Sequence, residues 1–231
     1  MNVLAIDTSN YTLGVCLFTE GTIMGEYMTN IKKNHSVRAM PAIEQLLKDC
    51  DMTPQDLDKI IVAKGPGSYT GVRIGVTIAK SLAWSLKIPI VGVSSLAVLA
   101  SNGRYFDGYI CPLFDARRGQ VYTGLYSYQN GDLVEEVEDC NVLAVEWFQK
   151  LKQKQRPVLF VGNDVSLHKE NIVSLLGDLA VFNRVTEQNP RPSELGLLGL
   201  SKEEDDIHML VPNYIRLAEA EAKWLEAQKN Q

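Results

Sequence analysis

The order of the predicted elements constrains this chain most, because that order occurs twice. Residues 3–93 and residues 109–182 each carry apolar and alternating patterns that predict three strands, a helix, a strand, a loop, a helix and a further strand. In both halves an aspartate, Asp7 or Asp115, follows the first strand, and a glycine-containing loop follows the fourth. The repeat predicts two similar α/β subdomains that face each other across a cleft.

The predicted boundary between the subdomains lies at Asn102-Gly103-Arg104, where the pattern stops before it restarts. We therefore place an N-terminal subdomain at 1–101 and a C-terminal subdomain at 102–231. The predicted strands are 3–6, 12–18, 22–28, 60–63, 88–93, 109–114, 120–128, 133–137, 157–161 and 179–182. The predicted helices are 40–50, with an irregular first turn at Pro41, and 72–86, 94–100, 142–151, 165–176, 193–200 and 218–229. The last helix can return to pack on the first subdomain.

Composition excludes several functional classes. With 231 residues the chain is long enough to bury a core, and its net charge of −5 argues against phosphate-driven nucleic-acid binding except through a local patch or a partner. The four cysteines are far apart without a C-x-x-C pair, so we expect free thiols in a reducing cytoplasm. The N-terminus lacks the basic start of a signal peptide, and charged residues interrupt the apolar stretch 72–93, so no membrane span is predicted.

A glycine-rich stretch at residues 64–75, Lys-Gly-Pro-Gly-Ser-Tyr-Thr-Gly-Val-Arg-Ile-Gly, links the strand 60–63 to the long helix. Its spacing does not match a P-loop, a dinucleotide-binding fingerprint or a nucleophile elbow. Glycine lets a backbone approach a ligand or another segment closely, and a helix N-terminus attracts anions. Two interpretations stay open from the residues: a loop that faces a ligand, and a tight strand-to-helix turn.

The repeated order of strand, aspartate, hairpin and third strand resembles the actin, Hsp70 and sugar-kinase fold. Four segments together are similar to the TsaB (YeaZ) family, and the similarity extends over essentially the whole chain. These segments are Ile6-Asp7-Thr8-Ser9, His35-Ser36 ahead of Met40-Pro41, residues 65–75, and Asp115-Ala116-Arg117-Arg118-Gly119-Gln120-Val121-Tyr122. The glycine-rich segment is the most specific of them.

The resemblance implies a cytoplasmic, non-catalytic scaffold and activator in the synthesis of threonylcarbamoyladenosine beside the anticodon of tRNA. It implies that the chain pairs with the catalytic paralogue TsaD and that an ATPase called TsaE joins through the complex. It also implies indirect contact with tRNA, and homodimers when the chain is alone. The catalytic paralogue carries V-N-H-x-x-x-H with two metal-binding histidines, whereas Ser95 and Leu99 stand at those positions here. Because leucine cannot bind a metal and a single hydroxyl is a poor ligand, we expect no metal centre.

The fold that the chain resembles places its first aspartates toward a nucleotide between the subdomains. The residues that would face a nucleotide or anion are Asp7, Ser9, Gly65, Gly67, Ser68, Tyr69, Thr70 and Arg73. We expect no tightly bound cofactor, with ATP or ADP at the interface of the complex. The alternative function is a stand-alone ATP-dependent phosphotransferase for small molecules, and the alternative for Asp7 is an Asx turn. Asp115 with Arg117 and Arg118 predicts either a site for an anion or a partner's carboxylate, or a solvated turn.

Small residues recur every four positions along the long helix, at Gly71, Gly75, Ala79 and Ala83. Such a stripe favours close approach of a second surface, which is either the chain's own core or a helix of a partner. We predict a partner interface and expect Ala79→Arg or Ala83→Arg to block association without unfolding the chain. The interface residues are His35, Met40, Ile43, Leu47, Gly71, Val72, Gly75, Ala79, Leu82 and Ala83.

Overall fold

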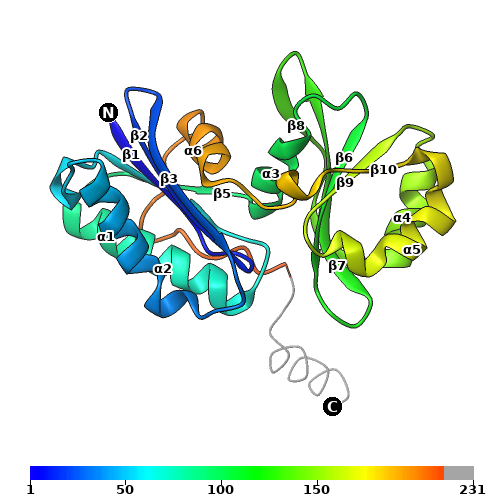
Figure 1. Ribbon diagram of the computed structural model, residues 1–231, viewed down its shortest axis with the longest axis horizontal. Coiled ribbons are helices and arrows are strands. Elements are labelled where there is room, and N and C mark those ends of the chain that lie inside the picture. Colours follow the sequence, from blue (N-terminus) through cyan, green and yellow to red (C-terminus); the bar gives the residue numbers. More distant parts are fainter. Residues whose placement is uncertain (216–231) are drawn as a thin grey trace.

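Two five-stranded sheets stand side by side in the computed structural model, which describes residues 1–215 (Figure 1). The first has the order β3-β2-β1-β4-β5 and the second the order β10-β9-β6-β7-β8, so the two halves share one topology. In each, the first three strands are antiparallel and the other two run parallel to the first. The structure thus confirms the predicted duplication, and the shared topology is the one expected from the resemblance to the actin, Hsp70 and sugar-kinase fold.

The strand bounds agree with the predicted ranges to within a few residues, except for a longer β8. The first sheet consists of β1 Asn2–Asp7, β2 Thr12–Thr19, β3 Thr22–Asn30, β4 Lys59–Ala63 and β5 Ile90–Val93. The second consists of β6 Tyr109–Asp115, β7 Gln120–Gln129, β8 Asp132–Leu143, β9 Val158–Val161 and β10 Ala180–Phe182. The strands β1, β4 and β5 are buried nearly throughout, which is why they read as continuous apolar runs.

Helices cover both sheets (Figure 1). They are α1 Ala39–Asp49, α2 Tyr69–Leu86, α3 Ser95–Ala100, α4 Ala144–Gln153, α5 Val165–Leu176 and α6 Pro192–Leu200. In the N-terminal half α1 and α2 lie on one face of the sheet and α6 on the other, whereas α4 and α5 cover the outer face of the second sheet. Pro41 falls in the first turn of α1, where its missing N–H needs no partner. The irregular turn that was predicted at Pro41 lies instead just before α1, as a separate 3-10 turn, His35–Val37.

The joint between the two halves is apolar. Helix α3 packs its Leu96, Leu99 and Ala100 against Ile110 and Phe114 of β6 in one buried cluster. This packing fills the space between the sheets at α3 and fixes the halves relative to each other. The predicted cleft therefore does not extend through the α3 joint.

The chain returns to the N-terminal half after residue 191. Helix α6 packs on β1, β2, β4 and β5, and the segment 204–215 then runs along β5 and α2. In three dimensions residues 192–215 therefore add to the first subdomain, although the sequence boundary assigns them to the second. The predicted helix 218–229 lies outside the described residues.

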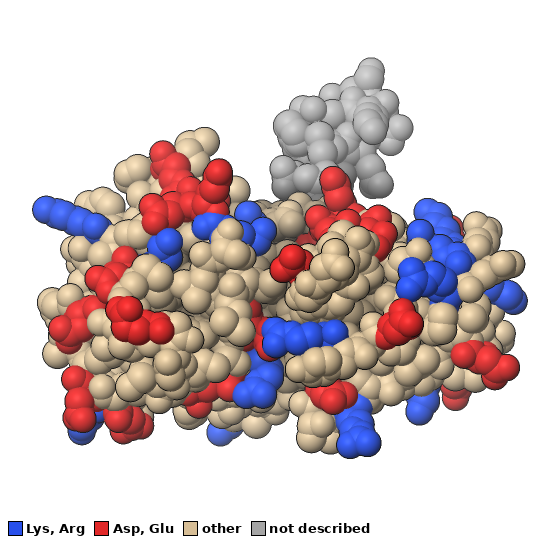
Figure 2. All heavy atoms as spheres, turned by 90° about the horizontal axis from the view of Figure 1, so that it is seen from above, with Lys and Arg blue, Asp and Glu red and all other residues tan. Residues whose placement is uncertain are grey.

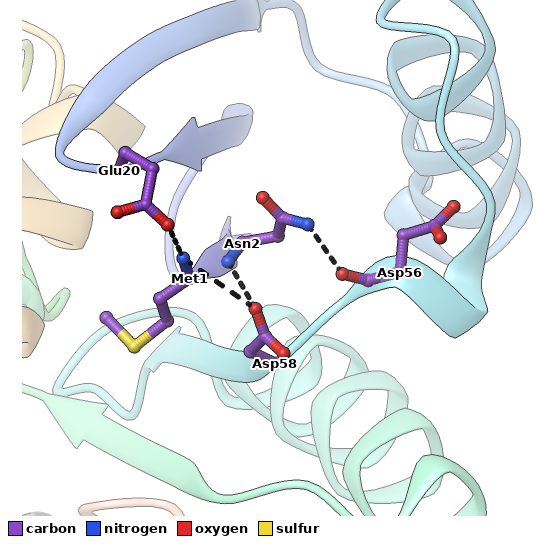
Figure 3. Close-up of polar contacts among 5 residues, drawn as sticks. All are labelled: Met1, Asn2, Glu20, Asp56 and Asp58. Atoms are coloured by element: carbon purple, nitrogen blue, oxygen red, sulfur yellow. Dashed lines mark hydrogen bonds and ion pairs between the residues drawn. The ribbon is translucent and has the colours of Figure 1, made fainter.

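Polar contacts hold the first residues of β1 in place (Figure 3). The Met1 ammonium binds the Glu20 carboxylate, and Asn2 donates its N–H to Asp58 at 2.6 Å and its amide to the Asp56 carbonyl at 2.8 Å. These contacts join the β2–β3 turn and the approach to β4 to the start of β1. Among residues 1–215, no helix has the length and apolar character needed to cross a membrane.

Candidate functional site

The glycine-rich stretch lies against the turn that follows β1. Ser68 donates its N–H to the Ser9 carbonyl at 2.7 Å, and Thr8 donates its hydroxyl to the Gly71 carbonyl at 2.7 Å. A Cβ added to Gly67 would lie 2.2 Å from the Ser9 oxygen, and one added to Gly71 would lie 2.2 Å from the Thr8 oxygen. These two glycines are required because the chain's own backbone occupies the space beside them.

The same contacts use N–H groups that a phosphate would need. The Ser68 N–H, at the N-cap of α2, is committed to a carbonyl, and Gly65 donates its N–H to the Ser95 hydroxyl at 3.0 Å. The peptide between Gly65 and Pro66 is cis. Of the two interpretations left open by the sequence, this geometry favours a tight turn packed on the β1–β2 turn.

The residues predicted to face a nucleotide fall into two groups. The buried group lies under the β1–β2 turn and consists of Asp7, Ser9 and Gly65, with Gly67 partly covered. The exposed group lies on the first turns of α2 and consists of Ser68, Tyr69, Thr70 and Arg73. The two groups therefore do not line one common surface.

Asp7 is fully buried at the end of β1 and forms an Asx turn, in which its Oδ1 accepts the Ser9 N–H at 2.8 Å. Burial raises the pKa of its carboxyl, whereas the hydrogen bond from the Ser9 N–H and the electrostatic effect of the nearby His35 ring lower it. His35 Nε2 lies 2.7 Å from the Asn10 carbonyl, which can only accept, so Nε2 carries a proton. Within residues 1–215, Asp7 Oδ2, Ser9 Oγ and His35 Nδ1 have no hydrogen-bond partner.

The corresponding aspartate of the second half has different neighbours. Asp115 donates its backbone N–H to Asp164 Oδ2 at 2.9 Å, and its own Oδ1 lies 3.6 Å from His168 Nε2. Burial raises the pKa of Asp164, and the charge of Asp115 adds to this rise. Arg117 and Arg118 lie in the exposed β6–β7 turn with positive φ angles of 63° and 54°.

The two positions that the resemblance compares with metal-binding histidines, Ser95 and Leu99, are used inside the chain. Ser95 is fully buried and its hydroxyl accepts the Gly65 N–H, whereas Leu99 is fully buried in the apolar joint. Among the described residues, no three His, Cys, Asp or Glu side chains lie close enough to share a metal ion.

The stripe of small residues on α2 packs inside the chain. Gly71, Gly75, Ala79 and Ala83 are buried, Ala79 and Ala83 completely, and they face β1, β4 and the β1–β2 turn. The interpretation as a partner contact is thus replaced by its alternative, the chain's own core. An arginine at position 79 or 83 would enter this core and unfold the chain, contrary to our expectation.

The other residues predicted for the interface divide in the same way. His35, Ile43, Leu47 and Val72 are buried, Leu82 is half-buried, and Met40 alone is exposed. The sequence could not distinguish the two faces of α2 because the helix is apolar nearly all round. Only the sheet beneath it determines which face is buried.

A different set of residues is exposed on the 3-10 turn His35–Val37, on α1 and on α2, and we call it the helix face. It consists of Val37, Met40, Tyr69, Arg73 and Trp84. Trp84 is 68% exposed and Val37 69% exposed. The sequence analysis did not select either residue. The available signal was a large apolar side chain beside a polar neighbour, as at Trp84 before Ser85.

The ends of the helix face have distinct surroundings. At the N-terminus of α2 the Tyr69 ring stacks on Tyr214 with centroids 5.0 Å apart, and the Arg73 guanidinium lies 5.3 Å from the Tyr69 ring. At the C-terminus Trp84 borders a groove of about 570 Å³, which Ile88, Ile207 and Glu204 also line. Exposed aromatic rings and arginine beside a groove are typical of protein–protein contact surfaces.

Comparison with known proteins gives consistent relatives. The family model described as TsaD, tRNA N6-adenosine threonylcarbamoyltransferase, matches residues 22–224. The chain is 65% identical to the tRNA threonylcarbamoyladenosine biosynthesis protein TsaB of Bacillus subtilis, over 99% of this chain and 100% of that protein. It is 36% identical to the TsaB of Buchnera aphidicola subsp. Schizaphis graminum, over 70% of this chain and 78% of that protein.

Solved structures agree with these relatives. The structure of YeaZ from Pseudomonas aeruginosa matches with a TM-score of 0.77 and 25% identity, over 92% of this chain and 99% of that chain. Full-length identity, the matching topology and the glycine-rich segment lead to one assignment. The chain belongs to the TsaB (YeaZ) family, in which the curated relatives named above are tRNA threonylcarbamoyladenosine biosynthesis proteins.

Proposed function

We propose that this chain is an accessory subunit of the machinery that makes threonylcarbamoyladenosine in tRNA, and that it activates its paralogue TsaD without performing the transfer. The observation that carries the proposal is the 65% identity to TsaB over 99% of the chain. The subunit would bind the active conformation of TsaD more tightly than other conformations and so increase its population.

Two features of the described residues support a non-catalytic role. Ser95 and Leu99 are used for a structural hydrogen bond and for the apolar joint. The N–H groups of Gly65 and Ser68 are used inside the chain. We therefore propose that this chain binds no nucleotide tightly and that ATP or ADP sits at the interface of the complex.

The helix face is the proposed TsaD contact. It combines exposed aromatic and aliphatic side chains with Arg73. The helices α1 and α2 that carry most of it lie together on one face of the first sheet (Figure 1). We propose that an isolated chain uses the same surface to form homodimers, that TsaE joins through TsaD, and that the complex works in the cytoplasm.

The test mixes this chain with TsaD, TsaE, tRNA and the small-molecule substrates. Trp84→Glu is expected to reduce co-elution with TsaD and tRNA modification together, because a carboxylate would replace an exposed ring of the contact. Leu167→Glu is the matched control, since Leu167 on α5 is 67% exposed and lies outside the helix face. Modification by TsaD that is undiminished when this chain is omitted would refute the proposal.

The alternative is a stand-alone phosphotransferase, which the fold type by itself allows. Calorimetry of the isolated chain with Mg-ATP separates the two functions. We expect no tight binding, because the N–H groups of Ser68, at the N-cap of α2, and of Gly65 are bonded inside the chain. Saturable binding at micromolar nucleotide would favour the phosphotransferase.

A further inference from the structure

A run of cations ends the helix α4 and is not used by the proposed function. Residues 150–156, Lys-Leu-Lys-Gln-Lys-Gln-Arg, contain four positive charges and no negative one, in a chain whose net charge is −5. All four charged side chains are exposed. Figure 2 shows Lys and Arg side chains gathered at the end of the molecule where α4 and α5 lie in Figure 1.

Compensation of the helix dipole explains only part of this run. Cations in the last turn of a helix are stabilising, and Lys150 and Lys152 lie there. Lys154 and Arg156 lie beyond the last helical residue, and both reach the ring of Tyr109, with Nζ 5.2 Å and Cζ 4.9 Å from its centroid. The run therefore continues away from the helix toward aromatic side chains.

Beside Arg156 lies a pocket of about 380 Å³ at the start of the second half. Arg104, Tyr105, Tyr128 and Gln129 line it together with Arg156. Tyr105 is 96% exposed, so its ring has both faces available to a ligand. We call Lys150, Lys152, Lys154, Arg156, Arg104 and Tyr105 the basic–aromatic patch.

The charges of this patch are only partly balanced. Arg104 binds Glu194 at 2.8 Å, and Arg156 lies 3.6 Å from the exposed Asp107. Within residues 1–215, Lys150, Lys152 and Lys154 have no carboxylate within ion-pair distance. Arg156 links the two parts of the patch, because it lies over the Tyr109 ring with Lys154 and lines the pocket with Tyr105. Lysines without a carboxylate partner and an exposed ring in one patch suit a ligand that carries both phosphates and unpaired bases.

We propose that the basic–aromatic patch binds single-stranded nucleotides of the substrate tRNA, so that the chain holds tRNA directly as well as activating TsaD. The lysines contact phosphates, and Tyr105 stacks on a base. Because single-stranded loops offer splayed bases and an RNA duplex does not, the patch prefers a loop to a paired stem. This inference rests on the proposed function for the identity of the RNA.

The experiment measures binding of unmodified tRNA transcript to the complex of this chain with TsaD at several salt concentrations. Lys152→Glu with Lys154→Glu is expected to weaken binding on the order of tenfold, and the dependence of log affinity on log salt is expected to fall by about two. Tyr105→Ala is expected to weaken binding about fivefold or more, whereas Tyr105→Phe keeps the stacking ring and retains affinity. A duplex RNA of the same length is expected to respond to the lysine changes alone.

Lys48→Glu with Lys202→Glu is the control, because it makes the same change in net charge at exposed lysines outside the patch. Equal tRNA affinity of the patch variants and this control overturns the inference. Loss of TsaD co-elution with unchanged tRNA affinity would make the surface a protein contact and overturn it as well. If the parent chain does not join TsaD, the proposed function fails. The tRNA affinities of the same variants are then measured on the isolated chain. Equal affinities of the patch variants and the control there also overturn the RNA contact.

Discussion

At the scale of single residues, Asp7 shows how burial changes the role of a carboxylate. Its position after the first strand suggested a group that faces a nucleotide, but the β1–β2 turn, the glycine-rich stretch and the His35 turn enclose it completely. Burial makes its negative charge unfavourable, and its pKa is raised. Asp7 therefore acts as a turn-forming side chain whose ionisation has an energetic cost.

We predict that Asp7→Asn stabilises the chain at neutral pH. The asparagine keeps an oxygen that accepts the Ser9 N–H but carries no charge. The pKa of Asp7 in the folded chain lies above the ordinary 3.8. Between these two pKa values the folded chain keeps a proton that the unfolded chain has released, so the free energy of unfolding of the parent falls as pH rises through this range. The gain from Asp7→Asn therefore grows with pH above about 3.8 and then levels off, at about 1.4 kcal/mol for each unit of pKa difference.

Urea denaturation of parent and variant from pH 4 to pH 8 measures this gain. Asp56→Asn is the matched control with the opposite sign, because hydrogen bonds from the Thr53 backbone and hydroxyl lower the pKa of Asp56. That variant is expected to lose stability above pH 4. A pH-independent difference between the parent and Asp7→Asn would contradict the role assigned to Asp7.

At the scale of elements, the segment 204–215 fastens the C-terminal part of the described chain to the first half. Asp205 exchanges hydrogen bonds with Ile90 and Gly92 of β5, at 2.9 and 2.7 Å, and Lys80 of α2 donates to the Leu210 carbonyl at 2.8 Å. Leu210 is 4% exposed within the core between the first sheet and its helices. The segment thus covers the edge of β5 and ties α2 to it.

We predict that Leu210→Ala lowers the free energy of unfolding by about 2–5 kcal/mol, because it leaves a cavity in that core. Met209→Ala, at a neighbouring side chain that is 75% exposed, is expected to change it by less than about 0.5 kcal/mol. Denaturant unfolding of both variants checks the difference. Similar small effects of the two would mean that the segment 204–215 is not held in the core.

The helix α2 shows what periodicity can and cannot predict. Its end at Leu86 and its start within the glycine-rich stretch followed from the apolar pattern, and the structure confirms both, although the helix begins at Tyr69, three residues before the predicted start. The face that it buries did not follow, because apolar residues surround the whole helix. Ala79 and Ala83 looked like contact residues for a partner, whereas Trp84, which sequence reasoning did not select, is the exposed one.

At the scale of the whole molecule, several connections join the halves. The helix α3 packs across the joint, Thr12 of β2 donates its hydroxyl to Asn189 Oδ1 at 3.2 Å, and α6 brings the chain back to the first sheet. Because the second crossing of the chain ties the two cores together, neither half is an independent unit.

We predict that the chain unfolds in a single cooperative transition, as seen by both circular dichroism and tryptophan fluorescence. Leu99→Ala, which removes buried atoms from the joint, is expected to shift that transition by about 2–5 kcal/mol without splitting it. Leu167→Ala, at an exposed side chain of α5, serves as the control. Two separate transitions in the parent chain would contradict the coupling of the halves.

The sequence by itself determined the duplicated topology, the element ranges and the family, because alternation, apolar runs and glycine spacing are local patterns along the chain. Only the tertiary structure decided which side chains and backbone segments come into contact. Asp7, Gly67 and Gly71 became parts of a closed junction because segments some sixty residues apart meet there, as Thr8 and Gly71 do. The basic run at 150–156 was readable in the sequence, but only the fold placed it beside Tyr105 and Tyr109.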